Sequence, residues 1–290
     1  MLELKPLKPG LEFAAEASGL DLKKVGSREA KQIEEAMNRF AVLVWRGQPL
    51  TEEQQIALGA HFGPLDTGLK KARKRAGRYA QEEIIDISNV TPEGGLYERA
   101  SAATISNLAN QLWHSDSSFQ KPSAKFSMLS AVVVPEEGGQ TEFADLRAAY
   151  DSLPVETKKI IENLSAEHYA WHSREWLGDT ISEEQARIFP PVQWPLVRTH
   201  PGSGRKVLFI GIHCTKVVGA TLAEGRMLLA ELMEHATQRE FVYRHEWRVG
   251  DLVMWDNRCT VHRGRRFDLA ARRELRRVTS EDASPEEMQA

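Results

Sequence analysis

Two polar residues, His114 and Asp116, stand two positions apart in the segment LWHSDSSFQ (112–120). Polar side chains beside such bulky apolar neighbours are costly to bury unless they have partners. If the segment is extended, both side chains lie on the same face, and an imidazole and a carboxylate stand side by side. A His-x-Asp pair alone is more often a surface pair or a hydrogen-bonded pair. A third residue is therefore needed before the pair predicts a metal site.

That third candidate is His262, which follows the strongly apolar segment DLVMW (251–255). Two imidazoles and one carboxylate that leave other metal positions open form the ligand set of non-haem Fe(II) oxygenases. His114, Asp116 and His262 can supply this set. A zinc hydrolase can also use two histidines and a carboxylate. However, the sequence contains no HExxH helix or other zinc signature.

A segment rich in arginine, RRELRRVTS (272–280), follows His262. If it is extended, Arg273, Leu275 and Arg277 share one face, and the two arginines stand roughly 13 Å apart at about 3.3 Å per residue. Two inward guanidiniums need anions, and their planar groups fit carboxylates, so they could bind two different carboxylates around one metal. The alternative is a basic edge strand that protects a sheet against aggregation. The residues leave both interpretations open.

Strand-like segments dominate the chain from Lys125 onward. They are apolar or alternating, and glycine-rich or proline-rich turns separate them. These segments are KFSMLSAVVV, TEFADL, WPLVRTH, KVLFIGI, EFVYRHEW, DLVMWDN and RRELRRVTS. One helix, over roughly 222–238, is predicted to interrupt them. His200 and His213 flank the KVLFIG strand, where they can face a cavity. Many strands with a few flanking helices predict a β-sandwich or jelly roll decorated by helices.

The first part of the chain predicts helices and one buried strand. Ser27 can cap a helix whose apolar residues recur at helical spacing up to Phe40, and a strand over 41–45 follows. Thr51 and Gln54 form a capping-box pattern for a second helix, which Gly63 can end.

Two stretches without clear periodicity are predicted to be loops. The basic stretch 66–82 is expected to be mobile, either as a solvated loop or as a lid over a site that binds an anion. Residues 91–110 are expected to form a second long loop.

Composition excludes several classes of protein. The chain has 290 residues and a net charge of −3, without the basic excess of a nucleic-acid-binding protein. Its two cysteines cannot form a disulfide framework, its N-terminus has no apolar signal region, and its apolar runs are too short to span a bilayer. We therefore expect a cytoplasmic protein without nucleic-acid or membrane partners. A single domain over 1–290, frayed from about residue 281, is the expected organisation.

Longer motifs connect these residues to a known family. They are VWRGQPLT (44–51), HFGPL (61–65), LWHSD (112–116), GGQTEFAD (138–145), GDLVMWDNRCTVH (250–262) and RRELRRVT (272–279). In these motifs the chain resembles the taurine dioxygenase-type Fe(II)/2-oxoglutarate-dependent dioxygenases, over most of its length. Longer stretches such as NQLWHSDSSFQ (110–120) and FADLRAAYDSLP (143–154) narrow the resemblance to members that act on aryloxyacetates.

The resemblance implies a mainly β fold with flanking helices, the double-stranded β-helix (a cupin-like jelly roll). It implies that His114, Asp116 and His262 bind Fe(II). It assigns Arg273 and Thr141 to the distal carboxylate of the co-substrate 2-oxoglutarate, and Trp255 can pack beside that co-substrate.

For the substrate, the resemblance implies that Arg277 holds an acid group, while Asn110 and Ser117 occupy pocket positions. Taurine-type members carry a histidine after the FGxL motif, but HFGPLDTGLKK (61–71) has none after Leu65. This departure disfavours taurine and leaves Lys70 or Lys71 as a cationic helper. His200 and His213 complete the expected substrate-binding group.

The implied reaction hydroxylates the methylene of a 2,4-dichlorophenoxyacetate-like acid and yields a phenol and glyoxylate, with succinate and CO2. Fe(II), 2-oxoglutarate and O2 are required, ascorbate is expected to stimulate turnover, and relatives are often homo-oligomers. The alternatives are the same chemistry on a sulfonate, an alkyl sulfate or a natural aromatic acid. A non-catalytic jelly-roll binding protein and a zinc hydrolase are the alternatives from other classes.

Overall fold

The computed structural model describes residues 1–68 and 78–283, and its largest element is a seven-stranded sheet. β2 and β3 run parallel, and the other neighbouring strands of this sheet are antiparallel. The strands, in spatial order, are β1 (Glu3–Pro6), β2 (Ala14–Ser18), β3 (Val42–Trp45), β13 (Leu252–Asp256), β5 (Ala124–Val133), β15 (Glu274–Glu281) and β4 (Ile85–Ser88).

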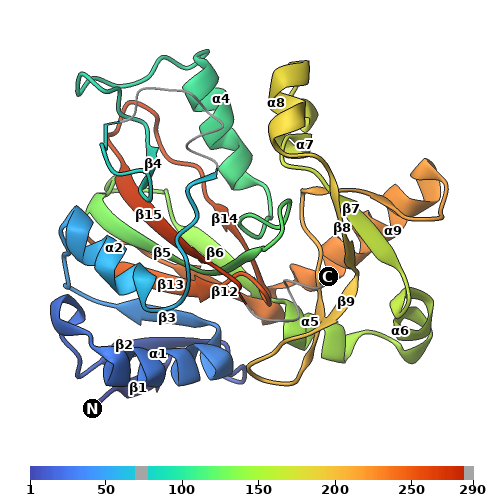
Figure 1. The fold of residues 1–290 in the computed structure, drawn as a ribbon, viewed down its shortest axis with the longest axis horizontal. Coiled ribbons are helices and arrows are strands. Elements are labelled where there is room, and N and C mark those ends of the chain that lie inside the picture. The colour runs from blue at the N-terminus through green and yellow to red at the C-terminus, as the bar shows by residue number, and fades with distance from the viewer. Residues whose placement is uncertain (69–77, 284–290) are drawn as a thin grey trace.

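Shorter antiparallel sheets form the rest of the β structure (Figure 1). One contains β12 (Val242–His245), β6 (Thr141–Asp145) and β14 (Thr260–Gly264). The others contain β11 (Cys214–Val217), β7 (Ser165–His168) and β8 (Val192–Pro195), and β10 (Lys206–Leu208) with β9 (Val197–Thr199). The predicted fold, mainly β with flanking helices in a jelly roll, is confirmed.

Both faces of the large sheet are buried, which explains why its strands are apolar without a break. In β13, Val253 and Trp255 point into the core between the sheets, whereas Leu252 and Met254 belong to a second core. The second core lies against α1 (Ser27–Phe40) and α2 (Glu52–Ala60), which cover the outer face of the sheet (Figure 1). A strand between two cores has no solvent face, so the polar half of the usual alternation is missing.

The two N-terminal helices form where the sequence predicts them, with one correction. α1 buries Ile33, Met37 and Phe40, but its N-cap is Gly26 rather than Ser27. The Glu29 carboxylate accepts a hydrogen bond from the Gly26 N–H at 3.1 Å, which is the reciprocal half of a capping box, while glycine offers no side chain to cap the first turn. α2 ends at Ala60, shortly before the predicted stop.

The described residues contain more helices than the sequence predicts. The predicted loop over 91–110 contains α4 (Ala102–Leu108) and the 3-10 turn η2 (Ala109–Gln111). The predicted single helix is α9 (Leu222–Ala236), and four more accompany the strands: α5 (Leu146–Ser152), α6 (Val155–Ile161), α7 (His172–Trp176) and α8 (Glu183–Ile188). Two further 3-10 turns are η1 (Leu22–Lys24) and η3 (Arg239–Phe241). Helices of five to seven residues are too short to show a helical period in the sequence.

β15 is an interior strand, so the interpretation as a basic edge strand is wrong. It pairs with β5 on one side and with β4 on the other. Its register against β5 shifts because Glu274 lies opposite Val133 and Leu275 opposite Ala131, which leaves the extra residue on β5. β15 therefore keeps its two-residue alternation. Leu275 enters the core between the sheets, and Arg276 points to the opposite side.

Residues 281 and 282 belong to the folded structure, although fraying is expected from about residue 281. Glu281 still belongs to β15, and the buried Asp282 donates its backbone N–H to the Ser123 carbonyl at 2.8 Å. Lys71 and residues 284–290 lie outside the described residues. In the described part, no helix is long and apolar enough to cross a membrane. A single domain over 1–290 stays a prediction.

The capping box of α2 gives a stability prediction. The Thr51 hydroxyl accepts from the Gln54 N–H at 3.2 Å, and the Gln54 amide oxygen accepts from the Thr51 N–H at 2.9 Å. Thr51→Ala should lower the free energy of unfolding by about 1 kcal/mol, measured by urea denaturation. Thr51→Ser keeps the capping hydroxyl and should leave the free energy of unfolding nearly unchanged. Equal losses in the two variants would contradict the assigned role.

Candidate active site

The two predicted histidine ligands are brought together by their own backbones. His114 donates its N–H to the His262 carbonyl at 3.0 Å, and His262 donates its N–H to the His114 carbonyl at 2.8 Å. Residues that exchange both hydrogen bonds in an antiparallel pair place their side chains on the same face. The two imidazole centroids accordingly lie 4.2 Å apart.

Asp116 joins the histidines through a turn rather than along a strand. Only His114 forms a β-bridge, and the chain turns directly after it, with Ser117 at φ +48°. The expected extended geometry is therefore wrong, although the proximity that it predicted is present. One Asp116 oxygen lies 3.9 Å from Nε2 of His114, and the other lies 4.0 Å from Nε2 of His262. One ligand atom from each of the three residues lies within 4.8 Å of the other two.

The imidazoles present the correct atoms and charge state for a metal. His114 Nδ1 is 2.7 Å from the Leu112 carbonyl, which makes Nδ1 the donor and leaves Nε2 free to bind a cation. Burial lowers the pKa of His114, and it lowers the pKa of His262 well below its ordinary value. Both rings are therefore neutral near pH 7, which is the form that binds metals.

Asp116 is a buried carboxylate that its surroundings keep ionised. Burial raises the pKa of its carboxyl group, but the positive charge of Arg277 and the hydrogen bond from the Ser127 hydroxyl help to hold the pKa below its ordinary value. The Ser127 hydroxyl donates to Asp116 at 2.7 Å, and Arg277 forms an ion pair with the other carboxylate oxygen. The carboxylate is thus charged at neutral pH and oriented before any cation binds.

A small hydrogen-bond network fixes the turn that carries Asp116. Asn257 accepts from the Asp116 N–H at 3.0 Å and from the Trp255 indole N–H at 3.0 Å, and its amide donates to the Ser127 hydroxyl at 3.0 Å. Ser127 also shares a hydrogen bond of 2.9 Å with Thr279. The network connects β13, β5 and β15 to the turn that carries Asp116.

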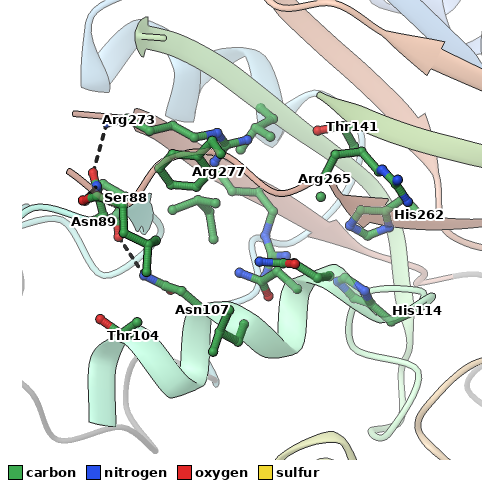
Figure 2. A pocket seen from close by; sticks show the side chains of 18 of the residues that line it. Ser88, Asn89, Thr104, Asn107, His114, Thr141, His262, Arg265, Arg273 and Arg277 are labelled. Carbon is green, nitrogen blue, oxygen red and sulfur yellow. Dashed lines mark hydrogen bonds between the residues drawn. The ribbon is translucent and has the colours of Figure 1, made fainter. Parts of the chain in front are cut away.

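Two adjoining cavities meet at the candidate metal position. The first is lined by Thr141, Trp255, His262 and Arg273, and its far wall is α4 (Figure 2). The second is lined by Asp116 and His213 and by the apolar side chains of Ile85, Phe119 and Ile212. Both cavities share four residues: Ile87, Asn110, His114 and Arg277. A metal held at this junction would face both spaces.

Arg273 is suited to bind an anion in the first cavity. It is 8% exposed, and burial lowers its pKa to about 10. Nη2 donates to the Gly139 carbonyl at 3.1 Å, but Nε has no hydrogen-bond partner among the described residues. A buried cation with an unused donor needs an acceptor. Thr141 lines the same cavity, and because its oxygen accepts from the Trp247 indole at 3.0 Å, its hydroxyl proton remains available to a bound carboxylate.

The predicted substrate-binding residues divide into two groups. Asn110, Arg277 and His213 line the cavities, and His213 Nδ1 is buried without a partner in the described part of the chain. Ser117 lines the second cavity, but its hydroxyl donates to Asp66 at 2.5 Å, so it holds the turn. His200 is not brought to either cavity, since Nε2 is 2.9 Å from Asp256 and Nδ1 is 2.8 Å from the Ser203 hydroxyl.

Sequence reasoning missed several residues that shape the site. Ser127 is polar in the apolar segment KFSMLSAVVV and lies on the same face as Leu129, which was a usable signal. Thr104 and Asn107 lie on α4, which was predicted to be a loop, and Arg174 lies on the short helix α7. Those three carried no signal of their own.

Comparison with known proteins agrees with this geometry. Residues 3–279 match the family described as taurine catabolism dioxygenase TauD, TfdA family. The chain is 60% identical to the alpha-ketoglutarate-dependent 2,4-dichlorophenoxyacetate dioxygenase of Cupriavidus pinatubonensis, over 96% of each chain. It is 36% identical to the (S)-phenoxypropionate/alpha-ketoglutarate-dioxygenase of Sphingobium herbicidovorans, over 90% of this chain and 89% of the relative.

A solved structure shares the fold. The crystal structure of AAD-2 in complex with Mn(II) and N-oxalylglycine superposes with a TM-score of 0.93 at 44% identity, covering 98% of this chain and 99% of the other. Fold and site thus define a dioxygenase, an oxidoreductase. The chain belongs to the taurine catabolism dioxygenase TauD, TfdA family.

The hydrogen bond between Ser127 and Asp116 predicts a change in metal affinity. Ser127→Ala removes the donor that orients the carboxylate, so the Kd for Mn(II), measured by titration calorimetry, should rise roughly 10-fold to 100-fold. Ser130→Ala is the matched control, because Ser130 is a buried serine on the opposite face of β5. An unchanged Kd in Ser127→Ala would remove this contact from the metal site.

The neutral imidazoles predict the pH dependence of metal binding. Because the folded-state pKa of both His114 and His262 lies below the ordinary value of 6.5, protons should not compete with the cation between pH 8 and pH 6.5. The Mn(II) affinity should therefore stay constant over this window and fall only at lower pH. A steady loss of affinity from pH 8 to pH 6.5 would show that an imidazole titrates near its ordinary pKa.

Proposed function

We propose that this chain is an Fe(II)- and 2-oxoglutarate-dependent dioxygenase that hydroxylates the methylene of an aryloxyacetate, such as 2,4-dichlorophenoxyacetate. One observation carries the proposal: two cavities, with a buried arginine for an acid in each, meet at two histidines and a carboxylate. A site for two different acids around one metal is what this reaction requires. The names of the curated relatives support the same substrate class.

His114, Asp116 and His262 would hold the metal. Three protein ligands leave other coordination positions open for the co-substrate and O2. When bound, iron and 2-oxoglutarate supply the oxidising chemistry, in which one oxygen atom of O2 enters succinate and the other enters the substrate. The protein supplies position and charge. The ionised carboxylate and the two neutral imidazoles lie together at the junction of the cavities.

Arg273 and Thr141 would bind the distal carboxylate of 2-oxoglutarate in the first cavity. The guanidinium brings an unused buried donor, and the threonine brings its hydroxyl proton. A carboxylate bound there would satisfy a cation that burial now disfavours. Trp255 lines the same cavity, and the centroid of its ring lies 4.6 Å from the centroid of the His262 ring. Its indole would form a wall beside the co-substrate.

Arg277 would bind the carboxylate of the aryloxyacetate. It lines both cavities and now pairs with Asp116. With Asp116 engaged as a metal ligand, the guanidinium of Arg277 would be available to the substrate's acid group. This contact would place the neighbouring methylene at the junction of the cavities, where positioning contributes most to the rate.

The second cavity would hold the aromatic ring. Ile85, Phe119 and Ile212 give it apolar walls, as is usual for such pockets. His213, with its unpartnered Nδ1, and Asn110 would supply polar contacts to the substrate. Lys71 would be a second cation for the acid group of the substrate.

Two predicted substrate contacts receive other roles in the proposal. Ser117 would shape the wall through Asp66 rather than bind the substrate. We assign no substrate contact to His200, because Ser203 and Asp256 engage both of its nitrogens.

The overall reaction balances as follows. The aryloxyacetate, 2-oxoglutarate and O2 give the hydroxylated acid, succinate and CO2. Hydroxylation replaces one methylene C–H bond by C–OH and produces a hemiacetal. The hemiacetal then transfers its hydroxyl proton to the ether oxygen as the bond between that oxygen and the former methylene carbon breaks, which releases the phenol and glyoxylate.

We also propose where the enzyme acts, how it assembles and what stimulates it. The enzyme would act in the cytoplasm as a homo-oligomer, without nucleic-acid or membrane partners, and ascorbate would stimulate turnover by keeping iron reduced.

A turnover assay tests the function. Purified protein with Fe(II), ascorbate and 2-oxoglutarate should release one phenol and one succinate for each 2,4-dichlorophenoxyacetate consumed, measured by chromatography. His262→Ala should abolish turnover while circular dichroism shows an intact fold. Succinate formation only with sulfonates, alkyl sulfates or other aromatic acids would overturn the substrate. No 2-oxoglutarate decarboxylation with any acid would overturn the enzyme assignment.

Separate variants of the two arginines test their roles. Arg273→Ala should raise the KM for 2-oxoglutarate by at least about 10-fold and change the KM for the aryloxyacetate little, since an ionic hydrogen bond contributes about 1.5–3 kcal/mol. Arg277→Ala should do the reverse. The measurement is initial succinate formation while one substrate is varied, and the opposite pattern would exchange the two assignments.

A further inference from the structure

Asn89 directly follows β4 and forms two hydrogen bonds with the backbone of Arg273. The β4–β15 ladder ends at the pair Ser88 and Glu274, and Asn89 continues the contact one residue further. The Asn89 N–H donates to the Arg273 carbonyl at 3.3 Å, and the Asn89 side-chain oxygen accepts from the Arg273 N–H at 2.9 Å. The second of these bonds appears as a dashed line in Figure 2.

The amide nitrogen of Asn89 holds the loop that leads to Arg273. It donates to the carbonyls of Leu269 at 3.1 Å and Ala271 at 2.8 Å. This loop connects β14, which carries His262, with β15, which carries Arg277. One buried side chain, 7% exposed, thus fixes both the path of the loop and the residue at its end.

The Arg273 side chain has little freedom to compensate for a shift of its backbone. On one side, Nη2 donates to the Gly139 carbonyl, and a Cβ atom on Gly139 would lie only 3.1 Å from Nε. On the other side, the guanidinium lies 5.5 Å from the centroid of the Phe267 ring. A guanidinium confined in this way follows its backbone, so the position of the backbone sets the position of the donor.

We propose that Asn89 is a positioning residue for the co-substrate, which holds the Arg273 backbone so that the guanidinium meets the distal carboxylate of 2-oxoglutarate. The proposal rests on the function proposed above. It assigns to Asn89 an effect that depends on that carboxylate. A loop clamp without this role would affect every ligand of the first cavity alike.

Two 2-oxo acids separate these possibilities. 2-Oxobutyrate is 2-oxoglutarate without its distal carboxylate, so it retains the metal-binding end and lacks the group that Arg273 would bind. Binding of both acids is measured by calorimetry with the Mn(II)-loaded protein, which reports affinity without turnover. Asn89→Ala should raise the Kd for 2-oxoglutarate by roughly 10-fold and leave the Kd values for 2-oxobutyrate and Mn(II) unchanged. In an Arg273→Ala background, Asn89→Ala should add no further loss.

Gln48→Ala controls for a general loss of stability. The Gln48 side chain also joins backbone groups, because it accepts from the Leu22 N–H at 2.9 Å and donates to the Leu20 carbonyl at 2.8 Å, away from both cavities. It should lower Tm without changing either Kd. If Asn89→Ala does not fold, Asn89→Asp serves in its place, since it keeps an acceptor for the Arg273 N–H and loses both donors. It should weaken 2-oxoglutarate binding selectively, by less than 10-fold.

Equal weakening of both acids, or a lower Tm with unchanged affinity for 2-oxoglutarate, would overturn the positioning role. Failure of the proposed function has a different signature. In that case the unsubstituted protein would not bind 2-oxoglutarate, or would bind it no more tightly than 2-oxobutyrate.

Discussion

A buried negative charge constrains the whole site. Asp116 is 4% exposed, and an isolated carboxylate at that depth is unstable unless opposite charge and hydrogen bonds surround it. The fold meets this requirement from two strands: Arg277 on β15 supplies the opposite charge, and the Ser127 hydroxyl on β5 supplies a hydrogen bond. Both strands are neighbours in the seven-stranded sheet. The jelly roll is, in this sense, the scaffold that allows one carboxylate to remain charged in the interior.

The sequence predicted the parts of the structure that depend on residue type and simple periodicity. Alternation along RRELRRVTS placed Arg273 and Arg277 on one face, and the structure keeps that alternation because the bulge lies on β5. The capping residues of α2 and the apolar spacing of α1 were equally readable. The proximity of His114 to Asp116 was predicted from an extended geometry that is absent, and a turn at Ser117 produces it instead.

Features that depend on contacts distant in sequence could not be read in advance. α4 has seven residues and no strong apolar stripe, yet it forms the far wall of the first cavity. His200 flanks a core strand as His213 does, but only His213 reaches a cavity. Periodicity places a side chain on a face of its own element, and the packing of other elements decides whether that face is open. Asn89 is a further case, because its role arises only where the end of β4 meets the loop before β15.

The alternation of β15 also limits how this protein can change. Sliding the strand by one residue would exchange Arg277 for Arg276 at the junction of the cavities and turn Leu275 away from the core. Arg276 is in turn held by Gln55 on the opposite side. An insertion or deletion within β15 would therefore displace these side chains, whereas α4 and α7 lie outside the large sheet. Because Arg273 and Arg277 lie on one continuous stretch of chain at β15, the strand sets the spacing between them, and the other walls of the two cavities can vary independently of that spacing.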